Sequence, residues 1–130
     1  MTDRYYITTP IYYVNDKPHI GHAYTSVATD FIARFMRLND YDVRFQTGTD
    51  EHGLKIQKAA ENKGKEPLEL CDENSRIFRD LTTTLDLSND DFIRTTEQRH
   101  INGASFLWNR LHERNQIYLG EYTGWYSIND

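Results

Sequence analysis

Hydrophobic and polar positions along this chain change between a strand pattern and a helical pattern. Residues 5–9 and 43–47 are rich in aromatic and β-branched side chains, which is typical of strands. Between them, residues 20–38 carry an apolar stripe at helical spacing, and the charged Asp30 and Arg34 fall outside it. The stripe consists of Tyr24, Val27, Ala28, Phe31, Phe35 and Leu38. The pattern therefore predicts a helix over 20–38 that covers a sheet with its apolar face.

The remainder of the chain continues the alternation of helical and extended patterns. The expected elements are, in order, a helix from residue 51 or 54 to about 62, a helix from Pro67 to about 85, a strand over 90–95, a helix over 97–114 with Thr96 at its cap, and a β-hairpin over 117–128. Strands that alternate with helices form parallel β-α-β units with right-handed crossovers. The sequence therefore predicts the α/β class, as a Rossmann-like parallel sheet with flanking helices.

Two polar segments, 9–22 and 47–53, each leave the carboxyl end of a predicted strand. In parallel sheets, ligands bind beyond this edge. The chain has neither the glycine fingerprint of dinucleotide-binding proteins nor the P-loop pattern that ends in Gly-Lys-Ser/Thr. A nucleotide site at this edge would therefore use another device.

The run PHIGH (18–22) stands where the first strand gives way to the long helix. Residues three apart on a helical turn share a face, so His19 and His22 can reach one ligand. Gly21 leaves room for a phosphate or a flat base, and the N–H groups at a helix start favour anions. Imidazole N–H groups also suit charge that develops on a phosphate during displacement. The run predicts an ATP site, and the alternative is two polar residues that cap a helix.

Asp50 lies in the run TGTDEHG (47–53), at the exit of the second strand. A carboxylate at this place can pair with an ammonium group in the same cleft. The alternative is that Asp50 caps the following helix, for which aspartate is a favoured residue. We expect Glu51 and His52 at the start of that helix rather than at a ligand.

Ile11 and Tyr13 follow the first strand, in the run TPIYY (9–13). These two side chains are placed to wall an apolar pocket between the two strand ends. Aromatic residues at such positions are more often part of a core than in contact with a ligand. The tyrosine pair is therefore ambiguous by itself.

Bulk properties exclude several classes of protein. A chain of 130 residues is long enough for one domain with a core, and a net charge of −5 argues against a generally basic surface that grips nucleic acid. The single cysteine, Cys71, gives neither a disulfide framework nor a Cys-x-x-Cys zinc knuckle, which fits a reducing cytoplasm. The sequence has no signal-peptide core and no apolar run that could cross a bilayer. We therefore expect a cytoplasmic protein without a membrane or disulfide partner.

The chain resembles the N-terminal part of the methionyl-tRNA synthetase family, in its bacterial and organellar branch of the class I aminoacyl-tRNA synthetases. The resemblance covers residues 5 to about 125. It rests on the runs TPIYYVNDKPHIGHAYTSVATDFIARF, FQTGTDEHG and DDFIRTTEQRH. The His-Ile-Gly-His run alone is moderately specific for class I synthetases, and its combination with TPIYYVN and TGTDEHG at these spacings is highly specific for the methionine enzyme.

The resemblance implies activation of methionine by ATP, which arrives with Mg²⁺, to methionyl-adenylate and pyrophosphate, followed by transfer of methionine to tRNA(Met). Its implied catalytic residues, His19 and His22, stabilise the α-phosphate. With Gly21 and Tyr12 they also form the implied ATP-binding set. No covalent enzyme intermediate is needed, so positioning and charge stabilisation are expected to supply the rate.

For methionine, the resemblance implies three contacts. Asp50 holds the α-amino group, the backbone carbonyl of Ile11 is a second partner of that ammonium, and Tyr13 covers the side chain. The implied domains are a nucleotide-binding catalytic domain over 1–116 and the beginning of an inserted connective domain over 117–130.

The chain also departs from the family pattern. The family's second signature, a Lys-Met-Ser-Lys-Ser-type loop, is absent. We therefore expect the opening quarter of a longer enzyme, with little or no adenylation by this chain alone. Ser127 and Asp130 stand where many relatives have the two cysteines of a zinc knuckle. Neither residue supplies a thiolate, so we expect no zinc there.

Two other functions stay open from the residues themselves. One is another class I adenylyl or nucleotidyl transferase, because many of these enzymes share His-x-Gly-His on a similar sheet. The other is a domain that binds nucleotide or RNA without catalysis. The runs TPIYYVN and TGTDEHG favour the methionine enzyme over the first of these, because they match a methionine pocket rather than a generic ATP cleft. Length favours it over the second, because a chain that stops within the expected hairpin is expected to be a piece of a longer enzyme.

Overall fold

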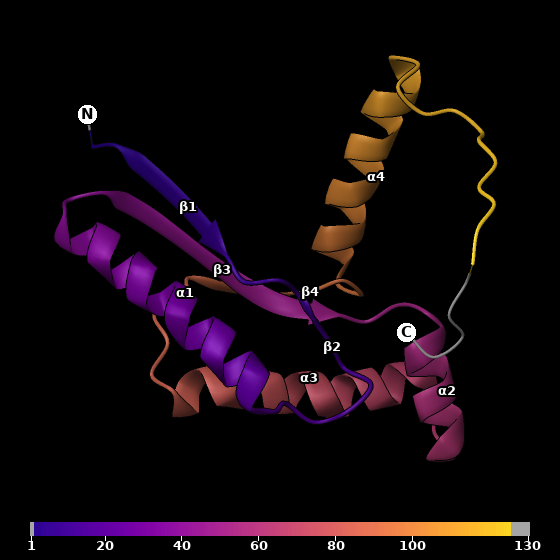
Figure 1. Cartoon of the computed structure of the whole chain (residues 1–130), viewed down its shortest axis with the longest axis horizontal. Coiled ribbons are helices and arrows are strands. Elements are labelled where there is room, and N and C mark those ends of the chain that lie inside the picture. Colours follow the sequence, from indigo (N-terminus) through magenta and orange to yellow (C-terminus); the bar gives the residue numbers. More distant parts are fainter. Residues whose placement is uncertain (1, 126–130) are drawn as a thin grey trace.

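The central strand β3 (Asp42–Asp50) carries the pairing of the whole sheet in the computed structural model, which describes residues 2–125. Strand β1 (Arg4–Thr8) pairs with the first half of β3, and β2 (Tyr12–Tyr13) pairs with its last two residues. Strand β4 (Asp91–Arg94) also pairs with β3, and all three pairings are parallel. The predicted parallel α/β architecture is confirmed (Figure 1).

A short break separates β1 from β2 along one edge of β3. At the break, the hydroxyl groups of Thr9 and Thr47 lie 2.7 Å apart in a buried hydrogen bond. Pro10 follows and has no N–H group to donate to a ladder. After the break the chain pairs again, and Tyr13 lies opposite Asp50. Two of the predicted ligand residues are thereby adjacent at the carboxyl end of the sheet.

Helices cover the sheet unequally (Figure 1). Helix α1 (Ile20–Leu38) contacts β1 and β3, and α3 (Pro67–Thr84) contacts β3 on the same side. The short α2 (Leu54–Asn62) packs on α3. Helix α4 (Gln98–Glu113) projects from the opposite side of the sheet, and none of its residues is buried.

The core lies where the carboxyl half of the sheet meets α2 and α3. Six buried side chains form its main cluster: Tyr12, Val14, Ile56, Cys71, Phe78 and Phe92. The aromatic ring of Tyr12 stacks on that of Phe78, with 5.7 Å between ring centroids. Burial of apolar surface at this place fixes β2 against α3, immediately beside the predicted ligand residues.

The bounds predicted for α1 are confirmed, but the prediction of its buried face was wrong. The apolar stripe faces solvent: Phe31 is 71% exposed and Leu38 is 83% exposed. The buried face consists of Ser26, Thr29, Asp30 and Ala33. Asp30 is tolerated there because its carboxylate accepts hydrogen bonds from Ser88, through both N–H and hydroxyl, and from the Arg34 guanidinium. These partners lower the pKa of Asp30, although burial alone would raise it.

Two predictions for the last part of the chain were also wrong. Thr96 does not cap α4, because the cap residue is Glu97, and no side chain caps the helix there. Residues 117–125 form no strand, and residues 126–128 of the expected hairpin lie outside the described part of the chain. Within residues 2–125, no helix combines the length and the hydrophobicity that a bilayer crossing requires.

Gly48 lies so close to β4 that we expect its substitution to destabilise the fold strongly. A Cβ atom at this position would lie 2.0 Å from the carbonyl oxygen of Ile93 on β4, and a backbone atom cannot move aside without opening the sheet. We expect Gly48→Ala to lower the free energy of unfolding by about 3 kcal/mol. Calorimetric unfolding midpoints would measure this.

The matched control is Gly103→Ala, in the interior of α4, where a Cβ atom would meet nothing within 4 Å. Alanine there should raise stability by about 0.5–1 kcal/mol, because glycine is a poor helix former. Equal effects of the two substitutions would contradict the close approach of β3 and β4.

Candidate active site

His19 and His22 cap the first turn of α1, and each uses its Nδ1 atom as an acceptor. The Gly21 N–H donates to His19 Nδ1 at 3.1 Å, and the His19 N–H donates to His22 Nδ1 at 3.0 Å. The two rings lie close together, with 3.9 Å between centroids. The structural alternative, two residues that cap a helix, is therefore true of this chain.

Capping does not compete with a chemical role. A neutral imidazole whose Nδ1 accepts a hydrogen bond carries its proton on Nε2. Both rings are then Nε2–H donors at a helix start, where backbone N–H groups already favour an anion. The capping geometry thus prepares a pair of donors for a phosphate.

Tyr12 and Phe78 hold the His22 ring from two sides. The Tyr12 and Phe78 rings meet the imidazole edge-on, with centroids 4.8 Å and 5.0 Å from that of His22. The Tyr12 hydroxyl group also hydrogen-bonds Ser26 Oγ at 3.0 Å. Partial burial lowers the pKa of His22, and the positive charge of a protonated His19 lowers it further. The surroundings therefore favour the neutral form of His22.

The neighbouring His19 ring gives a structural reason for glycine at position 21. A Cβ atom at this position would lie 3.0 Å from Cε1 and 3.1 Å from Nδ1 of His19. A larger residue would require the His19 ring to shift by a few tenths of an ångström. Gly21 therefore leaves room for the His19 ring in its capping position, in addition to any space that it leaves for a ligand.

Asp50 ends β3 and does not cap the helix that follows. Helix α2 begins at Leu54 with Gly53 as its cap, so the structural alternative for Asp50 fails. The Asp50 carboxylate makes one long contact, 3.4 Å from the backbone nitrogen of His52. Its strand partner is the half-exposed Tyr13. A partly exposed carboxylate with one weak partner is available to an ammonium group.

Ile11 lies in the break between β1 and β2 and lines an open pocket of about 540 Å³. Thr9, Thr47, Ile93 and His100 also line it, on the side of the sheet that faces α4. The lining of this pocket includes neither Tyr13 nor Asp50. The predicted apolar pocket therefore exists at Ile11, but Tyr13 does not share it.

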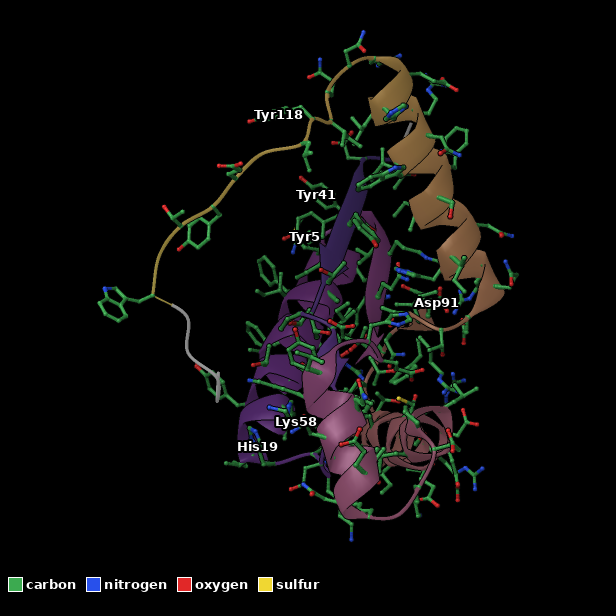
Figure 2. The ribbon with its side chains drawn as sticks, turned by 90° about the vertical axis from the view of Figure 1, so that its right-hand side faces the viewer. Tyr5, His19, Tyr41, Lys58, Asp91 and Tyr118 are labelled. Carbon is green, nitrogen blue, oxygen red and sulfur yellow. The ribbon has the colours of Figure 1, made fainter. Side chains whose placement is uncertain are left out.

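Tyr12 connects the two groups of predicted residues. Its ring contacts His22, and its neighbour Tyr13 pairs with Asp50. Figure 2 shows His19 at the far end of α1 from Tyr5 and Tyr41, where β1 and β3 begin. The histidine pair and Asp50 thus belong to the same carboxyl end of the sheet.

Sequence reasoning missed three features of this region. Strand β2 has only two residues, too few to show a period. Phe78 gave no signal, because it reaches His22 from a helix distant in sequence. Glu51 was expected at a helix start, but it is buried and lies outside α2. In the sequence, only the acidic and polar character of TGTDEHG hinted that Glu51 has a role other than starting a helix.

Metal ligands are not grouped in the part of the chain that the structure describes, where no three His, Cys, Asp or Glu side chains cluster. Ser127 and Asp130, the expected replacements for zinc-binding cysteines, lie outside that part. The absence of zinc at those two positions stays a prediction.

Comparison with known proteins identifies the family. The profile of the family described as tRNA synthetases class I (M) matches residues 5–130. The chain belongs to this family. It is 59% identical over 130 residues to methionine–tRNA ligase of Rickettsia conorii and 55% identical over 126 residues to that of Mesorhizobium japonicum. It covers 26% and 24% of these two proteins, so it spans about a quarter of their length.

Solved structures of the family agree with the fold. The chain superposes on Mycobacterium tuberculosis methionyl-tRNA synthetase in complex with methionyl-adenylate with a TM-score of 0.91 at 50% identity, covering 98% of this chain and 25% of that one. A leucyl-tRNA synthetase of Agrobacterium radiobacter gives a TM-score of 0.74 at 22% identity, covering 90% of this chain and 15% of that one, which supports the fold alone. The class I synthetase architecture expected from the sequence is confirmed.

Proposed function

We propose that this chain provides the histidine pair and the amino-acid carboxylate of an enzyme that activates methionine with ATP and then charges tRNA(Met). The observation that carries the proposal is the match of 98% of the chain, at 50% identity, to a synthetase in complex with methionyl-adenylate. The chain spans about a quarter of its relatives, so the proposed enzyme is a longer polypeptide.

The proposed first step is displacement at the α-phosphorus of ATP. A carboxylate oxygen of methionine forms a bond to phosphorus, the bond to the bridging oxygen of pyrophosphate breaks, and pyrophosphate leaves. Negative charge shifts onto the non-bridging oxygens during this step. The Nε2–H groups of His19 and His22 are suited to donate hydrogen bonds to those oxygens, which stabilises the transition state more than the ground state.

The proposed methionine site uses the end of β3. Asp50 pairs with the α-ammonium group, the Ile11 carbonyl group accepts from it, and Tyr13 covers the thioether side chain. The weak 3.4 Å contact of Asp50 and the half-exposed position of Tyr13 support these roles. We propose a different role for Tyr12, since its hydroxyl hydrogen-bonds Ser26 and its ring contacts His22. Tyr12 orients the histidine and acts on ATP only through it.

We propose the remaining partners from the same membership. Mg²⁺ accompanies ATP and compensates phosphate charge, tRNA(Met) accepts the methionyl group, and the reaction takes place in the cytoplasm. We propose that 117–130 begins a connective insertion and that Ser127 and Asp130 hold no zinc, because neither offers a thiolate.

Methionine-dependent exchange of pyrophosphate into ATP tests the proposal directly. The full-length enzyme should catalyse the exchange with methionine and not with leucine at equal concentration. The 130-residue chain alone should give little or no exchange, because it has no Lys-Met-Ser-Lys-Ser-type loop. Exchange by the full-length enzyme that is independent of the added amino acid would favour a general nucleotidyl transferase instead.

A further inference from the structure

Glu51, the residue after Asp50, has a fully buried side chain, with 0% of its surface exposed. Its carboxylate receives two parallel hydrogen bonds from Arg94 on β4, from Nε at 2.7 Å and from Nη2 at 3.0 Å. Paired, planar contacts of this kind fix both position and orientation. Glu51 is therefore an internal ion-pair partner and not a ligand-facing residue.

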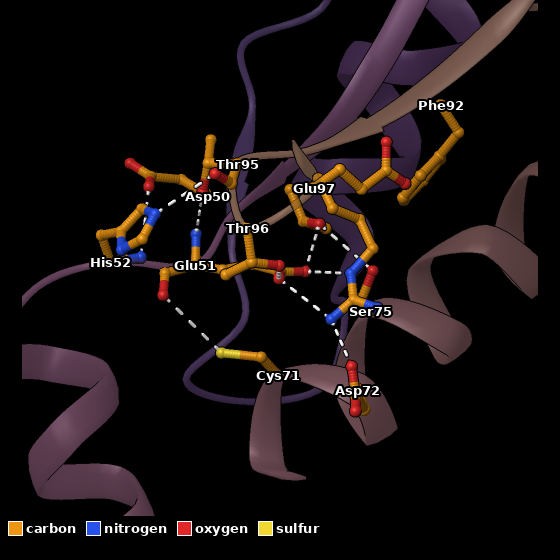
Figure 3. Close-up of polar contacts among 12 residues, drawn as sticks. Asp50, Glu51, His52, Cys71, Asp72, Ser75, Phe92, Thr95, Thr96 and Glu97 are labelled. Atoms are coloured by element: carbon orange, nitrogen blue, oxygen red, sulfur yellow. Dashed lines mark hydrogen bonds and ion pairs between the residues drawn. The ribbon is translucent and has the colours of Figure 1, made fainter. Parts of the chain in front are cut away.

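Two threonines complete the surroundings of the Glu51 carboxylate. The Thr49 hydroxyl donates to Oε1 at 2.9 Å, and the Thr96 hydroxyl donates to Oε2. Figure 3 shows these contacts converging on Glu51 from several segments. Asp72 accepts a further hydrogen bond from Nη2 of Arg94. Hydrogen bonding to Glu51 and Asp72 raises the pKa of Arg94 above its ordinary value, so the arginine stays charged.

The backbone of Glu51 is held as firmly as its side chain. Its N–H donates to the Thr95 hydroxyl at 2.8 Å, and the Cys71 thiol donates to its carbonyl oxygen with 3.8 Å between the heavy atoms. Burial, together with the negative charge of Glu51, raises the pKa of Cys71 to about 11, which keeps this thiol a donor. On the other side of Asp50, Thr49 accepts from the Thr95 N–H at 3.2 Å. Both neighbours of Asp50 are therefore fixed.

Asp50 itself has no comparable support. Among residues 2–125, its carboxylate makes one hydrogen bond, a 3.4 Å contact with the His52 N–H, which is drawn in Figure 3. Thr49 and Asp50 are successive residues of β3 and therefore point to opposite faces, and the Thr49 hydroxyl contacts Glu51, so Asp50 faces away from the side on which Glu51 is anchored. The direction of the Asp50 carboxylate thus depends on the backbone that Glu51 and Thr49 hold in place.

We propose that Glu51 is a positioning residue for methionine, and that its ion pair with Arg94 fixes the exit of β3 so that Asp50 meets the substrate ammonium group. The inference rests on the proposed function, since it assigns a role relative to bound methionine. It also gives a reason for Thr96, whose hydroxyl serves Glu51 and not the start of α4. The pair acts on the amino acid and leaves the histidine pair untouched, because it lies on the β4 side of β3.

The test uses Glu51→Gln and Arg94→Lys in the full-length enzyme, with the KM for methionine and the KM for ATP measured by pyrophosphate exchange. Glu51→Gln keeps the size of the side chain and removes its charge. Arg94→Lys keeps the charge and removes the paired geometry. We expect Glu51→Gln to raise the KM for methionine at least tenfold with the KM for ATP within twofold, and Arg94→Lys to give an intermediate value. Thermal unfolding and active-site titration report how much enzyme is folded.

Asp72→Asn is the matched control. Asp72 accepts from the same guanidinium at 2.5 Å but is 54% exposed and contacts neither neighbour of Asp50 through that bond. It should leave the KM for methionine within twofold. A lower unfolding midpoint with an unchanged KM for methionine in both Glu51→Gln and Arg94→Lys would overturn the proposal, and so would an equal rise of both KM values.

Asp50→Asn in the same assay distinguishes failure of the positioning role of Glu51 from failure of the proposed methionine site. If Asp50→Asn raises the KM for methionine and Glu51→Gln does not, only the positioning role fails. If Asp50→Asn also leaves the KM for methionine unchanged, the proposed methionine site itself fails.

Discussion

Replacement of Asp50 by alanine should raise the KM for methionine at least a hundredfold in pyrophosphate exchange, with the KM for ATP changed less than about threefold. The proposed role makes Asp50 the counter-charge of the substrate ammonium group. Loss of one partner from a desolvated charge pair costs about 3–5 kcal/mol, and each 1.4 kcal/mol is about tenfold. Asp50 caps no helix and makes one long hydrogen bond, so the fold should tolerate the change.

Asp42→Ala is the control for that substitution. Asp42 begins the same strand that Asp50 ends, and its side chain is 68% exposed, 3.9 Å from Arg4. Exposed pairs of this kind contribute little to stability. Asp42→Ala should leave both KM values unchanged. Similar KM values for methionine in the two variants would exclude Asp50 as the ammonium partner.

The order of elements was predictable because each boundary has a local cause. The helix over 20–38 has the predicted bounds, since Pro18 cannot lie inside it and the His19–His22 cap starts it. Pro67 likewise occupies the first turn of α3, as expected. Strand β2 was not predictable in the same way, because its two residues pair only after the break at Pro10.

The buried face of α1 was not predictable from hydrophobicity. The pattern separated an apolar stripe from a polar face, but it could not tell which of the two meets the sheet. The polar face is buried because Ser88, distant in sequence, supplies two hydrogen bonds to Asp30. A buried carboxylate is acceptable only where such partners exist, and partners of this kind become visible only in three dimensions.

Some residues of the candidate site could likewise be predicted from the sequence, and others could not. His19, His22 and Asp50 were predicted from residue type and spacing, because the chemistry proposed for them is visible in a short run. Glu51 was assigned to a helix start because its partner Arg94 lies 43 positions away. Its proposed role rests on contacts with Arg94 and Thr96, which lie far along the chain, and could not be derived from the run TGTDEHG.

The second large effect concerns the histidine pair. His22→Ala should lower kcat for adenylate formation by about 10²–10³, the usual cost of one lost donor to a developing negative charge, with a smaller change in either KM. The reason is the Nε2–H group that remains when Nδ1 accepts from the His19 N–H. His112→Ala, at an exposed position in the last turn of α4, should leave kcat unchanged.

His22→Asn distinguishes loss of the donor from loss of the cap. Asparagine can accept from the His19 N–H through its oxygen and still present an N–H group, so kcat should lie between those of wild type and His22→Ala. The pH profile adds an independent check. Burial and the neighbouring His19 lower the pKa of His22, so kcat should fall only as the pH drops through that lowered pKa. Equal kcat values for the alanine and asparagine variants, or a His22→Ala enzyme with wild-type kcat, would show that the pair serves only to begin α1.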